Sequence, residues 1–173
     1  MNEVIKALKS RRSIRQYKKE QISDEQLNQI LEAGMYAPSG MGAQSAIMVV
    51  VQDEKLIKKL SKLNAKFTDN PDSDPFYGAP TLVIVLADSN RNTYIEDGSL
   101  VMGNLMNAAY SVGVDSCWIH RAREMFEDEE GKALLKEWGI GENYIGIGIC
   151  ILGYRDCEYP EPKPRKEGYV IRV

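Results

Sequence analysis

The segment from Lys9 to Lys19 carries six basic residues and no acidic residue, although the whole chain has a formal net charge of −3. An arginine guanidinium can hold a phosphate through two parallel hydrogen bonds, and a serine hydroxyl can add another. Arg11, Ser13 and Arg15 therefore form a candidate anion-binding site directly after a predicted helix. The alternative is a solvated basic face whose cations complement the dipole at the end of that helix, and the spacing alone favours this simpler interpretation.

A second candidate segment runs from Pro38 to Gln44 and contains Ser39, Gly40 and Gly42. Small residues let a backbone approach a flat ligand closely, and the Gln44 amide can both donate and accept hydrogen bonds. An ordinary turn between a helix and a strand explains the proline and the glycines equally well. The segment suits a flat ligand without requiring one.

A third candidate segment is the end of a predicted strand, where Trp118 and Ile119 are followed by His120 and Arg121. Binding sites in proteins that mix helices and strands commonly lie where strands end. A lone histidine, however, is more often structural or exposed to solvent than catalytic. Cys117 has no base near it in the sequence, which argues against nucleophilic thiol chemistry.

Composition excludes several other kinds of site. The single histidine rules out a multi-histidine metal centre, and the three cysteines lack close Cys-x-x-Cys spacing. We therefore expect no bound metal, no disulfide and a cytoplasmic protein. Gly146 and Gly148 lie in a predicted strand and lack the third glycine of a dinucleotide-binding loop.

Charge and hydropathy exclude two classes of partner. A sequence pI near 5.3 argues against a protein that binds nucleic acid, because such proteins are usually basic. The longest apolar runs, residues 46–51 and 81–87, are far too short to span a membrane. The N-terminal residues also lack the apolar region of a secretory signal.

The elements that must position these segments follow from the spacing of apolar residues. Helical spacing predicts helices over residues 2–10, 23–37, 53–63, 94–112 and 128–138. Continuous apolar runs predict buried strands over residues 46–51, 80–87, 114–119 and 144–153. The polar loop 64–78 is predicted to be exposed and mobile. Because the elements mix without a regular βαβ repeat, we expect an α+β fold and, at 173 residues, one domain over 1–173.

The C-terminal segment is unusual. Residues 155–168 are polar and contain Pro160, Pro162 and Pro164, which predicts an extended arm. Residues 169–173 then carry a strand signal, and a strand at the end of an arm needs a sheet edge. Spacing alone leaves two options open, an edge of the chain's own sheet or an edge in another subunit.

Four segments together resemble the nitroreductase family of FMN-dependent oxidoreductases. They are residues 11–17, residues 37–44, the predicted helix with Asp97-Gly98-Ser99, Asn104-Leu105 and Ala108-Ala109, and the basic stretch 160–166. The resemblance covers nearly the whole chain in order. It implies an α+β fold with a central, mainly antiparallel sheet flanked by helices. It also implies an intertwined homodimer in which residues 154–173 form a C-terminal arm exchanged between subunits.

The resemblance further implies two FMN sites at the subunit interface. The basic and hydroxyl residues would hold the phosphate and ribityl chain, and the segment 38–44 would contact the flavin, in part from the second subunit. The strand-end segment would run along the ring, with backbone N–H groups near His120 and Arg121 facing N5 and O4. The cofactor-binding residues implied in this way are Arg11, Arg12, Ser13, Arg15, Pro38, Ser39, Gln44, Cys117, Trp118, Ile119, His120, Arg121, Lys163 and Arg165.

The chemistry implied by the resemblance is transfer of a hydride from NADH or NADPH, through flavin N5, to a small acceptor such as a nitroaromatic or a quinone. FMN would be tightly bound and the nicotinamide transient. No side chain would need to act as a nucleophile or a metal ligand, because the flavin carries the reaction. Two alternatives stay open: a protein that stores or senses FMN without turnover, and a family offshoot that acts as a specific dehalogenase or dehydrogenase.

The chain departs from the family pattern at the second segment. Gly42 stands where many members have asparagine, and Ser45-Ala46 replace a frequent Pro-Trp pair. The chain is also short for the family, so we expect it to lack a helical excursion that covers the active site in larger relatives. The resemblance therefore implies neither a particular acceptor nor a choice between NADH and NADPH.

Overall fold

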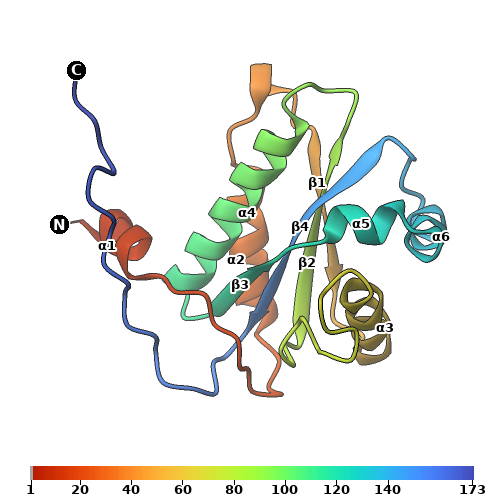
Figure 1. The fold of residues 1–173 in the computed structure, drawn as a ribbon, viewed down its shortest axis with the longest axis horizontal. Helices are drawn as coiled ribbons and strands as arrows, with labels where there is room; N and C mark the ends of the chain where they lie inside the picture. Colours follow the sequence, from red (N-terminus) through yellow and green to blue (C-terminus); the bar gives the residue numbers. More distant parts are fainter. Residues whose placement is uncertain (1) are drawn as a thin grey trace.

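The computed structural model describes residues 2–173 and has a four-stranded sheet at its centre (Figure 1). The strands are β1 (Ala46–Val51), β2 (Thr81–Asp88), β3 (Asp115–Ile119) and β4 (Tyr144–Gly153). They lie in the order β1-β2-β4-β3, and all neighbouring strands are antiparallel. The predicted α+β class with a mainly antiparallel sheet is confirmed.

Helices cover both faces of the sheet (Figure 1). One face carries α2 (Asp24–Met35) and α4 (Tyr94–Ser111). The other carries α3 (Glu54–Ala65), α5 (Ala122–Glu127) and α6 (Glu129–Glu137). The two central strands are therefore buried on both sides, which explains why their sequences are apolar without interruption.

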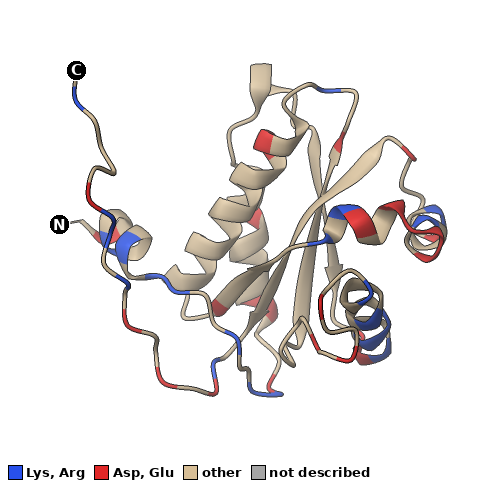
Figure 2. Ribbon diagram, viewed as in Figure 1, with Lys and Arg blue, Asp and Glu red and all other residues tan. Residues whose placement is uncertain are grey.

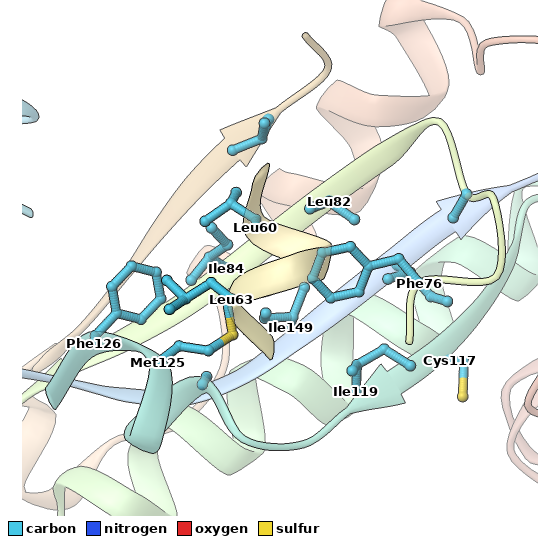
Figure 3. Close-up of a cluster of buried hydrophobic side chains, with 14 of the residues drawn as sticks. Leu60, Leu63, Phe76, Leu82, Ile84, Cys117, Ile119, Met125, Phe126 and Ile149 are labelled. Atoms are coloured by element: carbon cyan, nitrogen blue, oxygen red, sulfur yellow. The ribbon is translucent and has the colours of Figure 1, made fainter. Parts of the chain in front are cut away.

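The alternation of side chains along β2 divides the core into two clusters. Ile84 points into the cluster beneath α3, where it joins Leu60, Phe76 and Ile149 (Figure 3). Val85, the next residue, points into the cluster beneath α2 and α4. Successive strand residues face opposite sides of a sheet, so one short strand supplies both cores.

The first helix is less covered than the others. In α1 (Glu3–Ser10) the Asn2 side chain caps the N-terminus by accepting the Ile5 N–H at 3.0 Å, and no helix residue is buried. Its apolar side chains Val4, Ile5 and Leu8 are 67%, 44% and 53% exposed. An uncovered apolar helix face of this kind is typical of an interaction surface.

Two local features differ from the sequence predictions. The predicted helix at 128–138 is present as α6, but α5 precedes it and was not predicted, because six residues are too few to show a helical period. Loop 64–78 is not simply exposed. Phe76 is fully buried, and Asp74 accepts hydrogen bonds from the Ser61 hydroxyl at 2.7 Å and from the Phe76 N–H at 3.0 Å. These contacts attach the loop to α3.

The C-terminal arm leaves the sheet after β4 and runs past α1 (Figure 1). Residues 169–173 are exposed and form no strand, so the option that they fold back onto the chain's own sheet is wrong. The outer edge of β3 is not free for them, because Ser13 pairs there with Ser116 in a parallel bridge.

Candidate functional site

The basic segment after α1 lies against the edge of the sheet. Ser13 is bridged to Ser116 of β3, and the Ile14 N–H donates to the Ser116 carbonyl oxygen at 3.0 Å. The Ile14 side chain is fully buried, and the Tyr17 hydroxyl donates to the Ile14 carbonyl oxygen at 2.8 Å. Ile14 therefore anchors the segment at the edge of the sheet, and basic residues lie along the backbone on either side of it (Figure 2).

Arg11 is the cation in this segment whose position points most directly to a ligand. Its Nη1 atom is buried and has no hydrogen-bond partner among the described residues. The same is true of the Ser116 hydroxyl oxygen and of Arg12 Nε, but the Arg12 guanidinium is paired through Nη1. A buried donor on a cation costs free energy unless an acceptor pairs with it. The donor set, a guanidinium and a hydroxyl, fits the oxygens of a phosphate. Arg15 is exposed.

Arg12 has a different role from its neighbour. Its Nη1 atom donates to the carbonyl oxygens of Lys9 and Arg11, both at 2.8 Å. These contacts lie at the C-terminal end of α1, where backbone carbonyls lack partners within the helix. Arg12 thus caps the helix and steadies the start of the basic segment.

The segment 38–45 forms a tight turn that leads into β1. Gly40–Gly42 is a single 3-10 turn, and the Ser39 hydroxyl oxygen accepts the Gln44 N–H at 3.0 Å. Met41 and Gln44 have φ angles of 54° and 50°, a left-handed conformation that non-glycine residues rarely adopt. Strain of this kind persists where the surrounding structure imposes it, and it is common at ligand sites.

The residue that imposes this conformation is Asp97 of α4. It is 2% exposed, and its carboxylate accepts the Gly40 N–H at 2.8 Å and the hydroxyls of Ser45 at 2.6 Å and Thr93 at 3.3 Å. Burial by itself would raise the pKa of Asp97, but the hydrogen bonds from Ser45, Gly40 and Thr93 hold it below its ordinary value. Ser45, which replaces a residue frequent in the family, is thus one of the groups that hold the turn.

We predict that Asp97→Asn destabilises the fold by about 1–3 kcal/mol, because an amide N–H would face groups that are themselves donors. A carboxyl group whose pKa is lower in the folded chain than in the unfolded chain stabilises the fold at pH values above its unfolded-state pKa. This stabilisation is lost as the pH falls through the folded-state pKa. The wild type should therefore lose urea resistance below about pH 4. The variant should lose less over the same range, and Asp69→Asn, in an exposed loop, should behave as the wild type. Equal urea midpoints for all three chains at pH 7 would contradict this role.

The strand-end segment combines buried and exposed side chains. Cys117 and Ile119 are 1% and 8% exposed and point into the core beneath α3 and α5, so only their backbone can meet a ligand. Trp118 is half-buried, and His120 and Arg121 are exposed. Arg121 has a φ angle of 75° and is the N-cap residue that precedes α5. The chain therefore turns sharply at the point where the family resemblance implies that backbone N–H groups face the flavin.

Asn64 of α3 holds this turn in place. Its Nδ2 atom donates to the His120 carbonyl oxygen at 2.8 Å and contacts the Met125 sulfur at 3.1 Å. Asn64 is 1% exposed, so the contact is made inside the protein. Sequence reasoning missed Asn64, because it placed this residue at the start of a loop; a polar residue directly after the buried side of a helix was the signal available.

Among the described residues, no hydrogen bond or ion pair joins Lys163 or Arg165 of the arm to the Arg11 segment. Lys163 and Arg165 are exposed, and Arg165 donates from Nη2 to the Lys163 carbonyl oxygen at 2.6 Å, which is a contact within the arm. Their predicted part in the phosphate site therefore depends on where the arm lies when another subunit is present.

The candidate segments occupy opposite edges of the sheet. The Arg11 segment lies beside β3, whereas the 38–45 turn leads into β1, and these strands are separated by β2 and β4. Three strand spacings amount to about 14 Å. The turn is also held at the N-terminal end of α4, a helix of 18 residues and about 27 Å. Within one chain, the two segments do not meet.

Comparison with known proteins gives consistent results. The family model described as "Nitroreductase family" matches residues 8–154. A protein of Archaeoglobus fulgidus named for NADH dehydrogenase and NAD(P)H nitroreductase activity is 33% identical over 98% of this chain and 91% of its own length. A Bacillus subtilis FMN reductase [NAD(P)H] is 43% identical over 53% of this chain and 34% of its own length.

Solved structures show the same fold. A nitroreductase of Bacteroides fragilis with bound FMN matches with a TM-score of 0.92 and 33% identity over the whole of both chains. A nitroreductase of Desulfitobacterium hafniense, also with bound FMN, matches with a TM-score of 0.87 and 26% identity over 100% of this chain and 99% of that one. No helix among residues 2–173 is long and apolar enough to cross a membrane. The same residues contain no cluster of His, Cys, Asp and Glu that could hold a metal ion.

Proposed function

Because this chain belongs to the nitroreductase family, we propose that it is an FMN-dependent enzyme that moves electrons from NADH or NADPH to small acceptors such as nitroaromatics or quinones. The observation that carries the proposal is the buried Nη1 atom of Arg11, which has no hydrogen-bond partner among residues 2–173. A phosphate oxygen would supply the missing acceptor. The FMN-bound relatives of the same fold support this choice of ligand.

The residues of the proposed site divide the work of binding. Arg11, Ser13 and Arg15 would hold the phosphate and ribityl chain, and Lys163 and Arg165 of the arm would complete the phosphate site. In addition, Pro38, Ser39 and Gln44 would contact the flavin, and the backbone of residues 117–121 would run along its edge. When bound, FMN would supply two-electron transfer between the nicotinamide and the acceptor.

The role of the protein itself would be to orient the flavin. The left-handed turn at Arg121 would present backbone N–H groups to the flavin, and the hydrogen bond from Asn64 to the His120 carbonyl oxygen would hold that turn in place. Preorganised backbone donors of this kind stabilise charge that develops on a ligand without any reorganisation cost. No side chain in the proposed site has to act as a nucleophile.

The proposed enzyme is a homodimer with sites formed by both subunits. One FMN cannot contact the Arg11 segment and the 38–45 turn of the same chain, since these lie at opposite edges of the sheet. A second copy can bring its turn to the first copy's arginines. The uncovered apolar face of α1 and the exposed apolar residues of the arm, Tyr169, Val170 and Ile171, supply surface for such an interface. The three free cysteines support a cytoplasmic location.

We predict that the purified protein is yellow, releases FMN on denaturation, and loses its flavin absorbance near 450 nm when excess NADH or NADPH is added without oxygen. Air or an added quinone should restore the absorbance, and free FMN at equal concentration is the control for slow uncatalysed reduction. Bound flavin that stays oxidised under an excess of both nicotinamides would instead indicate the storage or sensing alternative.

A further inference from the structure

One tyrosine at the root of the C-terminal arm is bonded to the backbone on both sides of Arg11. The Tyr159 hydroxyl oxygen accepts the Arg12 N–H at 2.9 Å and donates to the Ser10 carbonyl oxygen at 3.1 Å. These partners lie 147 and 149 positions away in the sequence. A single hydroxyl therefore fixes the backbone that carries the candidate phosphate ligand.

The Tyr159 ring is itself held by groups from the sheet and from α4. The Arg155 guanidinium lies over the ring, 5.0 Å from its centre, and Arg155 pairs through Nη1 with the Asp115 carboxylate at 3.3 Å. Asp115 is 8% exposed and also accepts the Arg155 N–H at 3.1 Å. The Tyr110 ring lies 6.4 Å from the Tyr159 ring. The hydroxyl is thus presented by a ring with little freedom to move.

The hydroxyl can act as a donor only when it is protonated. Burial raises the pKa of Tyr159 above its ordinary value, and the charges of Tyr110 and Asp115 act in the same direction, although the Arg12 N–H opposes them. The phenol therefore keeps its proton throughout the neutral range. The contact with the Ser10 carbonyl is a permanent feature of the fold at working pH.

We infer that Tyr159 is a positioning residue for the phosphate end of the cofactor: its hydroxyl holds the Ser10–Arg12 backbone so that the Arg11 guanidinium is presented to the phosphate. This inference rests on the proposed FMN site. It adds that the root of the arm contributes to the site within its own subunit, before any exchange with the partner. It also predicts selectivity: riboflavin lacks the phosphate, so its binding should not depend on the Tyr159 hydroxyl.

The test compares Tyr159→Phe with the wild type and with Tyr154→Phe. The control removes a comparable hydroxyl, which donates to Gln26 Oε1 at 2.6 Å and lies outside the proposed site. Dissociation constants of the full chain for FMN and riboflavin are measured by quenching of flavin fluorescence. Tyr159→Phe should weaken FMN binding about 5- to 20-fold, because the Arg11 guanidinium would no longer be aligned for its charge-assisted contact with the phosphate. Riboflavin binding should change less than about 2-fold. Tyr154→Phe should leave both constants near the wild-type values.

A double-variant cycle makes the result independent of riboflavin affinity. If Tyr159 acts through Arg11, adding Tyr159→Phe to Arg11→Ala should weaken FMN binding little further. Full additivity, or equal loss of FMN and riboflavin, would reduce Tyr159 to a structural residue and overturn the inference. Normal FMN binding by Tyr159→Phe alongside weak binding by Arg11→Ala would overturn it too, while leaving the proposed function intact. A wild-type chain that binds no FMN would instead refute the proposed function.

Discussion

Replacing Arg11 with alanine should weaken FMN binding about 10- to 100-fold, which corresponds to the loss of one charge-assisted contact at a partly buried site. Arg11 is half-buried, and its side chain makes no hydrogen bond or ion pair with the described residues, so the variant breaks no polar contact of this kind in the chain itself. The free energy of unfolding of the apoprotein should therefore stay unchanged or rise slightly, because an unpaired buried donor is removed.

The measurement is the dissociation constant of FMN, followed by flavin fluorescence, together with a urea unfolding curve of the apoprotein. Lys18→Ala is the matched control, since Lys18 is an exposed cation of the same basic segment. An unchanged FMN constant for Arg11→Ala would return the arginines to the simpler interpretation of a solvated basic face. Equal weakening by both variants would indicate a general effect of charge in place of a defined phosphate site.

A chain that ends at Tyr159 should be a monomer without FMN. Residues 160–173 are exposed along their whole length, so their removal takes little from the core of the chain itself. It removes the apolar end of the arm and both cations, Lys163 and Arg165, proposed to complete the phosphate site. Ending the chain after Tyr159 keeps the contacts to Ser10 and Arg12, so the loss can be assigned to the arm alone.

Light scattering gives the mass of the truncated protein, and absorbance after denaturation gives its flavin content. Two full-length variants separate the contributions of the arm. Lys163→Ala with Arg165→Ala should remain a dimer and bind FMN more weakly, whereas serine at Tyr169, Val170 and Ile171 should weaken the dimer. A truncated chain that is still a stable dimer loaded with FMN would show that the arm is dispensable for both.

The elements of the fold were largely predictable because each depends on a short-range pattern. The strand at 80–87 and the strand at 144–153 are uninterrupted apolar runs, and both are central in the sheet. The helix predicted over residues 23–37 is present as α2, and its start is fixed by a capping box in which the Ser23 hydroxyl oxygen accepts the Gln26 N–H at 3.2 Å. By contrast, α5 was missed because its six residues are shorter than two helical turns.

The residues that position the site were less accessible to sequence reasoning. Asp97 was part of a recognised motif, but its bonds to Gly40 and Ser45 cross more than 50 positions. Asn64 and Tyr159 were not singled out, because both act through hydrogen bonds to backbone groups far away in the sequence. Periodicity and spacing describe neighbours along the chain, and they carry no information about such pairs.

The sequence by itself determined the chemistry on offer: a basic segment suited to a phosphate, a turn of small residues suited to a flat ring, and apolar runs that demand a two-sided core. Only the tertiary structure decided that the basic segment and the turn stand at opposite edges of one sheet. It also decided that the Nη1 atom of Arg11 is buried without a hydrogen-bond partner among residues 2–173, since burial depends on which elements pack together. Strand order and packing are properties of the assembled chain, set by hydrogen bonding and hydrophobic burial between segments far apart in sequence.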